Sequence, residues 1–199
     1  MAIIDLLNIK KLYDNQSRVE GAGQVVGSSY ITSQEFGNSA CHETILTLNN
    51  LPVSVVSVTT GNGVGGTKIY QMNAGYMRFM GGTANLSLSI AAGKQADFTD
   101  ATPEGSLGVG TLAPANADAL GTDSTDDNIC TATAFVCAAY ADTSITLPPE
   151  ADLLLNGTSS AIGVFLNAFV GSADIDDGVT TEVLVSGTVH FFWQNLGDY

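Results

Sequence analysis

The sequence is short of basic residues: six Lys or Arg stand against 20 Asp or Glu in 199 residues, for a formal net charge of −14. All six lie at or before Lys94, and fifteen carboxylates but no Lys or Arg follow from Gln95 to Tyr199. A surface of this sign repels the phosphates of nucleic acids and the anionic headgroups of lipids. We therefore expect neither nucleic acid nor a membrane as a partner.

Long apolar runs and a cysteine framework are also lacking. No stretch has the length needed to cross a bilayer, and the opening MAIIDLLNIKKLYDNQ places its lysines after the apolar cluster, the reverse of a secretory signal. Cys41, Cys130 and Cys137 make an odd count, which does not indicate a set of disulfides. We expect a soluble protein made and kept in a cytoplasm.

Helical periodicity is nearly absent, whereas alternation with period two recurs. In the stretch 84–90, Leu86, Leu88 and Ile90 alternate with polar residues, which predicts a half-buried strand. The last strand, 183–193, has one apolar face, made of Val183, Val185, Val189, Phe191 and Trp193. Further strands are predicted at 44–48, 53–60, 68–72, 76–80 and 162–170.

These segments predict an all-β fold: an antiparallel β-sandwich or jelly-roll-like barrel with long loops and an N-terminal arm. We expect residues 1–20 to be the arm, as a short helix or an extended segment, and residues 21–199 to form a single domain. The strands at 162–170 and 183–193 are expected to pair across an acidic turn at 173–178. Residues 99–128 are expected to be surface loop or short edge strands, and 149–156 two turns of helix.

Within VVSVTTGNGVGGTKIY, residues 55–70, Gly61, Gly63 and Gly66 have the G-x-G-x-x-G spacing of a dinucleotide-binding turn. That motif binds a pyrophosphate only where a helix follows the glycines, and Thr67 to Met72 reads as a strand instead. A β-hairpin explains the glycines, with Asn62-Gly63 and Gly65-Gly66 as turn residues. The sequence predicts no cofactor.

Groups for catalysis are few, and we expect no enzyme. The only histidines are His42 and His190. Cys41 and His42 are adjacent, so a strand directs them to opposite faces, and His190 lies opposite the apolar face of its strand. No G-x-S-x-G elbow is present. Paired carboxylates of a glycosidase stay open as an alternative, although the single Trp lies in a predicted core strand.

Metal sites have little support in the sequence, and we predict none. Asp174, Asp176 and Asp177 precede Gly178 but do not keep the register of an EF-hand loop. Asp123, Asp126 and Asp127 form a second acidic cluster without a fixed template. Cys130 and Cys137 lack the second close pair that a structural zinc site needs.

The C-terminal half carries a resemblance. GVFLNAFVGSADIDDG followed by VLVSGTVHFFWQNLGDY resembles the ending of a group of tailed-bacteriophage virion proteins, in which a V-x-G-T-V strand runs into W-x-N-L-G-D. GSLGVGTLAPANADALGTD is similar to the Gly/Ala/Asp segment upstream of it. The resemblance covers about the last hundred residues and implies a capsid decoration, or cement, protein: a β-rich homotrimer bound to the major capsid protein on the outside of the head.

The N-terminal segment is the predicted contact with the capsid or a sister subunit, because it combines apolar side chains with two lysines: Ile3, Ile4, Leu6, Leu7, Ile9, Lys10, Lys11, Leu12 and Tyr13. Two alternatives stay open. One is a receptor-binding, tail-fibre or carbohydrate-binding β-domain, and the other is a metal-dependent hydrolase.

Overall fold

The computed structural model describes residues 23–26, 29–38, 41–59, 61–98, 102–115, 120–121, 125–137, 142–150, 152–176 and 178–197. Within these ranges there are eleven strands, one 3₁₀ turn and no α-helix, which confirms the predicted all-β class. The strands are β1 (Gln24–Val25), β2 (Ile31–Gly37), β3 (Cys41–Thr59), β4 (Gly61–Gln71), β5 (Gly75–Ile90), β6 (Glu104–Gly110), β7 (Cys130–Val136), β8 (Thr143–Leu147), β9 (Leu153–Gly157), β10 (Gly163–Ile175) and β11 (Thr180–Gly197).

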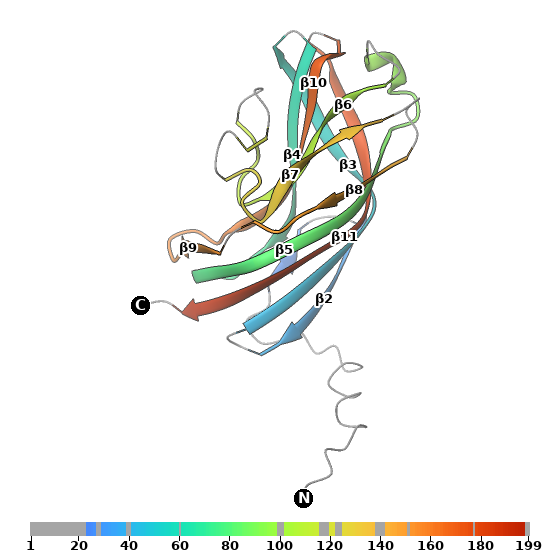
Figure 1. Ribbon diagram of the computed structural model, residues 1–199. Coiled ribbons are helices and arrows are strands. Elements are labelled where there is room, and N and C mark those ends of the chain that lie inside the picture. The colour runs from blue at the N-terminus through green and yellow to red at the C-terminus, as the bar shows by residue number, and fades with distance from the viewer. Residues whose placement is uncertain are drawn as a thin grey trace, which may run out of the picture.

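The strands form one antiparallel sheet that curls into a nearly closed barrel. Its order is β7-β6-β10-β4-β3-β11-β5-β8, with β1, β2 and β9 paired to β4, β3 and β5. The two ends of this sheet, β7 and β8, meet where the Thr131 N–H donates to the Pro148 carbonyl at 3.0 Å and where Cys130 and Pro149 form an isolated antiparallel β-bridge. Figure 1 shows β5 and β11 side by side with β2 at one end, and β4, β6 and β10 toward the other.

Two β-bulges keep apolar side chains inside along the longest strands. In β3 the inward set changes from His42, Thr44, Leu46 and Leu48 to Leu51, Val53 and Val55, and the extra residue is absorbed around Asn50, whose φ is +49°. In β5 the shift falls at Met80, between Phe79 opposite Trp193 and Gly81 opposite Phe192. Each bulge resets the alternation, which a strand of unbroken period two could not do.

Aromatic rings fill the barrel where β3, β4, β5 and β11 meet. Phe191 lies 5.8 Å from both Tyr70 and Phe79, measured between ring centroids, and all three rings are buried. The five residues predicted for the apolar face of the last strand are fully buried. Each such side chain stabilises the fold by about 1.5–3 kcal/mol.

Three element predictions were wrong. Strands β10 and β11 are consecutive in the chain but do not pair with each other, because β4 and β3 lie between them in the sheet. The second half of the predicted helix at 149–156 lies in strand β9, which continues the sheet beside β5. Part of the predicted loop at 99–128 is β6, an interior strand between β10 and β7 that buries Leu107 and Val109.

The glycine-rich stretch is a hairpin, as predicted, but Gly63, Gly65 and Gly66 are not its turn residues, because the last pair before the turn is Thr59 with Asn62. Strand β4 begins at Gly61 and directly follows β3, so no helix follows the motif. Gly63, Gly65 and Gly66 lie within β4 without positive φ. They are required by close packing: a Cβ on Gly65 would lie 1.7 Å from the Ser54 carbonyl oxygen, and one on Gly66 2.3 Å from Asn167 Oδ1.

Candidate interaction surface

Rows of small uncharged side chains cross the outside of the sheet. Residues paired in register across β2, β3, β11, β5 and β8 form the first row: Thr32, Thr47, Thr188, Asn85 and Thr146. Side chains paired in this way on one face lie about 4.5–5.5 Å apart at Cβ. Threonine suits such a row because its branched Cβ favours extended backbone.

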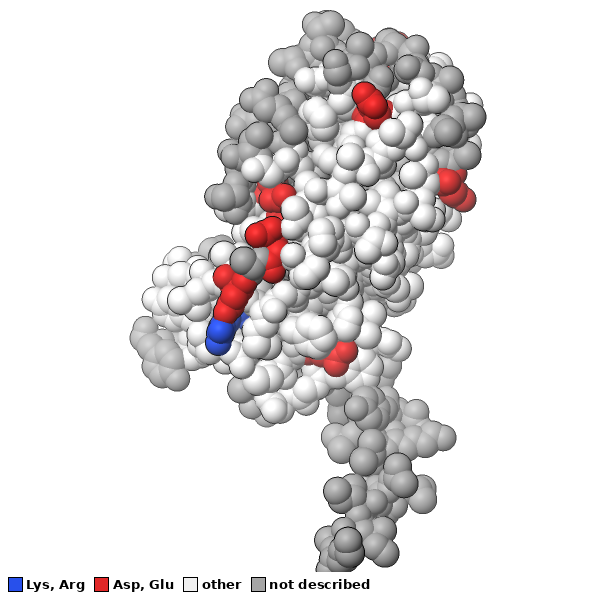
Figure 2. Space-filling model, viewed as in Figure 1, with Lys and Arg blue, Asp and Glu red and all other residues white. Residues whose placement is uncertain are grey.

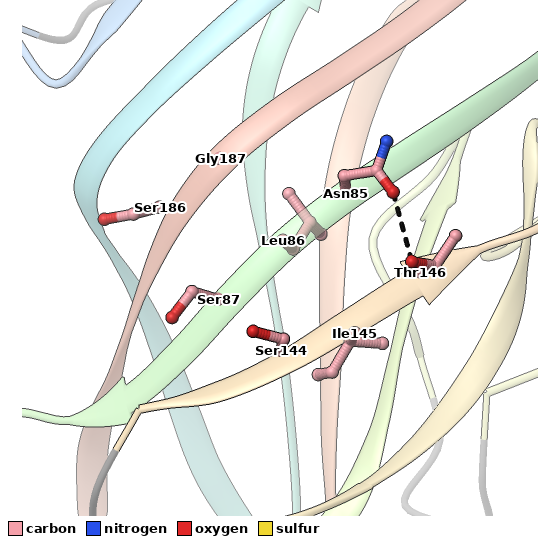
Figure 3. Close-up of a pocket in the computed structure, with 8 residues that line it drawn as sticks. All are labelled: Asn85, Leu86, Ser87, Ser144, Ile145, Thr146, Ser186 and Gly187. Atoms are coloured by element: carbon pink, nitrogen blue, oxygen red, sulfur yellow. Dashed lines mark hydrogen bonds between the residues drawn. The ribbon is translucent and has the colours of Figure 1, made fainter.

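A second row runs beside the first and is made of serines. Ser186, Ser87 and Ser144 are paired in register across β11, β5 and β8, and Figure 3 shows them on three adjacent strands. They border an open hollow of about 430 Å³, in which the Thr146 hydroxyl donates to Asn85 Oδ1 at 3.1 Å. The hollow therefore presents hydroxyl and amide groups to whatever approaches it.

We call these eight residues the neutral face, because none of them carries a charge although the chain has a net charge of −14. On the side of the molecule drawn in Figure 2, most of the described surface is neither acidic nor basic; red occurs in a line that ends at the blue atoms and in a few separate places. A neutral surface on an acidic protein is where another acidic molecule, including a second copy, meets the least repulsion.

Four exposed large apolar side chains lie further along the same sheet, one row beyond His190, and we call them the apolar patch: Met80, Leu154, Phe192 and Leu196, which are 43%, 64%, 42% and 37% exposed. Phe192 is opposite Gly81, directly after Met80, and Leu154 is opposite Arg78. The bulge in β5 adds Met80 to the outside of the sheet. Neighbouring exposed apolar side chains of this size mark contact surfaces in proteins.

An ion pair lies within the apolar patch. Arg78 Nε donates to both carboxylate oxygens of Asp152, at 3.0 and 2.9 Å, and Nη2 donates to Oδ2. These hydrogen bonds, together with the positive charge of Arg78, lower the pKa of Asp152 below its ordinary value. The two charges compensate each other. The other carboxylate beside the patch is Glu43, the register partner of Phe192 on β3, whose Oε1 lies 2.9 Å from His190 Nε2. We refer to the neutral face and the apolar patch together as the interaction surface.

A buried polar network lies on the inner side of the same sheet. The Trp193 indole donates from Nε1 to the Thr44 hydroxyl at 2.8 Å, and Thr44 donates to Glu35 Oε1 at 2.9 Å. The Tyr70 hydroxyl also donates to Glu35, and burial, then the Glu35 charge, raises the pKa of Tyr70 well above its ordinary value. The network links β2, β3, β4 and β11, and so fixes the strands that carry the interaction surface.

The structure places the predicted histidine and cysteine residues as expected. Cys41 is exposed and His42 is buried, where its ring stacks on Trp193 at 4.0 Å between centroids. His190 is partly exposed and its Nε2 lies 2.9 Å from Glu43 Oε1. The Cys41–His42 pair thus faces two sides of β3, which is the geometry that a Cys-His dyad cannot use.

Two carboxylates of the acidic cluster at 123–127 accept hydrogen bonds from backbone N–H groups. Asp126 Oδ1 accepts from the Gly121 N–H at 3.0 Å, and Asp127 Oδ2 accepts from the Ala132 N–H at 3.1 Å. Asp123 and Asp177 lie outside the described residues. In the described part of the chain, no group of three or more His, Cys, Asp or Glu side chains could hold a metal ion.

The sequence did not identify the interaction surface. The contact residues predicted from the sequence lie outside the described residues, and their role stays a prediction: Ile3, Ile4, Leu6, Leu7, Ile9, Lys10, Lys11, Leu12 and Tyr13. The sequence did indicate that one strand has an exposed polar side, because Asn85, Ser87 and Ser89 alternate with core residues. Which strands lie beside this one depends on pairing between distant segments, which alternation does not encode.

Comparison with protein-family models found no match, and a search of curated proteins found none either. Among the residues that the structure describes, no helix is long and apolar enough to span a membrane.

Proposed function

We propose that this protein is a structural component of a phage virion: a decoration protein that binds the major capsid protein on the outside of the head as a homotrimer and stabilises the shell. The observation that carries the proposal is the interaction surface. It has exposed Met80 and Phe192 side chains on the same sheet as rows of hydroxyl groups, and that sheet is held by a buried core. An apolar centre with a polar rim is the usual anatomy of a protein interface.

The charge distribution supports self-association at this surface. Two copies of a chain with net charge −14 repel each other at most orientations. On the interaction surface, Arg78 and Asp152 compensate each other and the neutral face adds no charge. Copies that meet there bury Phe192 next to Glu43, a carboxylate that already has a hydrogen-bond partner in His190.

The resemblance to phage virion proteins falls on strand β11. The V-x-G-T-V segment is Val185–Val189 and the W-x-N-L-G segment is Trp193–Gly197. Val185, Val189 and Trp193 are fully buried, whereas Phe192 and Leu196 of the same strand are exposed in the apolar patch. The strand that carries the resemblance therefore builds both the core and the proposed interface.

Stabilisation of the head needs no active site, because a protein that binds only the assembled shell favours that state by mass action. The N-terminal segment remains the predicted contact with the capsid. Its residues, from Ile3 to Tyr13, would reach the shell while β11 and β5 join sister copies.

Size-exclusion chromatography with light scattering tests the trimer. The wild-type chain is expected to elute at three times its mass of 20.5 kDa, and Phe192→Asp at the monomer mass. Val136→Asp is the matched control, because Val136 is 55% exposed on β7, outside the apolar patch. A monomeric wild-type protein, or a trimer that Phe192→Asp leaves intact, contradicts the proposed interface.

Binding to empty heads of the phage that encodes the chain tests the function. Saturable co-sedimentation at a fixed number of copies per head supports decoration, and deletion of residues 1–13 is expected to abolish it. Binding to a glycan array without binding to heads would favour the alternative, a receptor-binding or carbohydrate-binding domain.

A further inference from the structure

Lys68 differs from the other basic residues of the described part of the chain, because no carboxylate there lies within ion-pair distance of it. Arg78 pairs with Asp152, and Lys94 Nζ lies 3.4 Å from Asp97 Oδ2. Lys68 Nζ instead donates to Gln71 Oε1 at 3.0 Å and lies 5.4 Å from the centroid of the Phe165 ring. Its positive charge is therefore available to a ligand.

The Lys68 side chain is held in place before any ligand arrives. It extends from β4 across the neighbouring strand β10, where Phe165 is its register partner. It passes over Gly163, on which a Cβ would lie 2.9 Å from Lys68 Cε. A lysine confined in this way loses less conformational freedom on binding than a free surface lysine does.

Lys68 borders a hollow of about 350 Å³ that also has apolar walls and uncharged polar groups. Leu112, Leu155 and Phe165 form part of the wall, and Thr111, Asn156 and Ser160 add hydroxyl and amide groups. This volume is at the lower end of the range for small-molecule sites, about 300–1,000 Å³.

The polar groups of the hollow are only partly used. Thr111 Oγ1 accepts from Asn128 Nδ2 at 3.0 Å, which leaves its own proton to donate. Asn156 Oδ1 accepts from the Thr158 N–H and hydroxyl, and Nδ2 donates to the Tyr76 hydroxyl at 3.3 Å, which leaves one amide proton. Two fixed donors thus stand near one fixed cation.

We propose that this hollow binds a sugar acid, a monosaccharide that carries one carboxylate. The carboxylate pairs with the Lys68 ammonium, the sugar hydroxyls accept from Thr111 and Asn156, and the ring lies against Leu112 and Leu155. The net charge of −14 disfavours ligands with several negative charges, so a single carboxylate fits the site better than a polyanion. This inference is independent of the proposed role on a phage head.

Nuclear magnetic resonance titration of the full-length protein tests the site, with D-galacturonate as the probe and D-galactose and acetate as comparisons. Galacturonate is expected to bind in the millimolar range or tighter and to shift the amide signals of Lys68, Phe165 and Ser160. Lys68→Met is expected to weaken binding at least tenfold, and Lys94→Met to leave it unchanged.

If Lys68→Met does not fold, the titration of the wild-type protein is sufficient to test the proposal. Shifts that map away from the hollow, or no saturation by galacturonate, overturn the proposal. Acetate or galactose binding as tightly as galacturonate also overturns it, because the site would then not recognise the sugar and the carboxylate together.

Discussion

The indole nitrogen of Trp193 lies 2.8 Å from the hydroxyl oxygen of Thr44, and both side chains are fully buried. Thr44 accepts this bond and donates to Glu35, so one hydroxyl serves both the buried indole and the partly buried carboxylate. Buried groups left without such partners cost about 1–3 kcal/mol each.

Thr44→Val keeps the shape of the side chain and removes the hydroxyl. We expect the free energy of unfolding to fall by about 1–3 kcal/mol, because the Trp193 N–H loses its acceptor. Urea denaturation followed by tryptophan fluorescence measures the change. Thr47→Val on the exposed side of the same strand is the control and is expected to change stability by less than about 0.5 kcal/mol. Equal effects of the two changes would mean that the network does not stabilise the fold.

Tyr70 should make the protein sensitive to alkali. Burial and Glu35 raise its pKa in the folded protein, so the folded chain keeps a proton that the unfolded chain loses above about pH 10. Its contribution to stability is complete below that pH and is lost above it, by up to about 1.4 kcal/mol per pH unit. The difference in unfolding free energy between wild type and Tyr70→Phe should therefore be constant to pH 9 and shrink above pH 10. A constant difference up to pH 11 would contradict this account.

Gly65 should not tolerate a side chain. In Gly65→Ala the new Cβ would meet the backbone carbonyl of Ser54, which cannot move without separating β3 from β4. We expect a loss of more than about 3 kcal/mol, measured by thermal unfolding. Gly93→Ala is the control that separates steric clash from backbone strain, because Gly93 has φ +83° but open space around it. We expect this variant to lose only about 1–2 kcal/mol of unfolding free energy.

The three cysteines should differ in reactivity. Cys41 is exposed, whereas Cys130 and Cys137 are buried, and burial raises the pKa of Cys130 to about 12. A thiol reagent at neutral pH is expected to modify one cysteine of the native protein and all three after denaturation. Cys41→Ser should leave no reactive thiol in the native state, and rapid reaction of that variant would place a second cysteine at the surface.

The sequence was sufficient for features that depend on neighbouring residues. The alternation of Leu86, Leu88 and Ile90 predicted a strand, and the apolar face of the last strand, with Trp193, proved to be core. Cys41 and His42 were placed on opposite faces because side chains alternate along any strand.

Features that depend on distant pairing could not be predicted in the same way. The strands at 163–175 and 180–197 follow each other in the chain, yet the first pairs with β4 and the second with β3, so that these two strands lie between them. Glycine is common in turns, so the sequence suggested a turn at Gly65. In the structure a glycine is required there because the Ser54 carbonyl of the adjacent strand leaves no room for a Cβ. Met80 became part of an exposed patch only through a bulge in β5.

The most direct test of the central claim is the temperature at which phage heads release their DNA, measured with and without this protein bound. We expect the release temperature of heads that lack the protein to rise with its occupancy, because ligands of the assembled shell stabilise it. Val136→Asp should stabilise heads as the wild type does, and Phe192→Asp should not. Heads whose release temperature is unchanged at full occupancy would contradict a role in decoration.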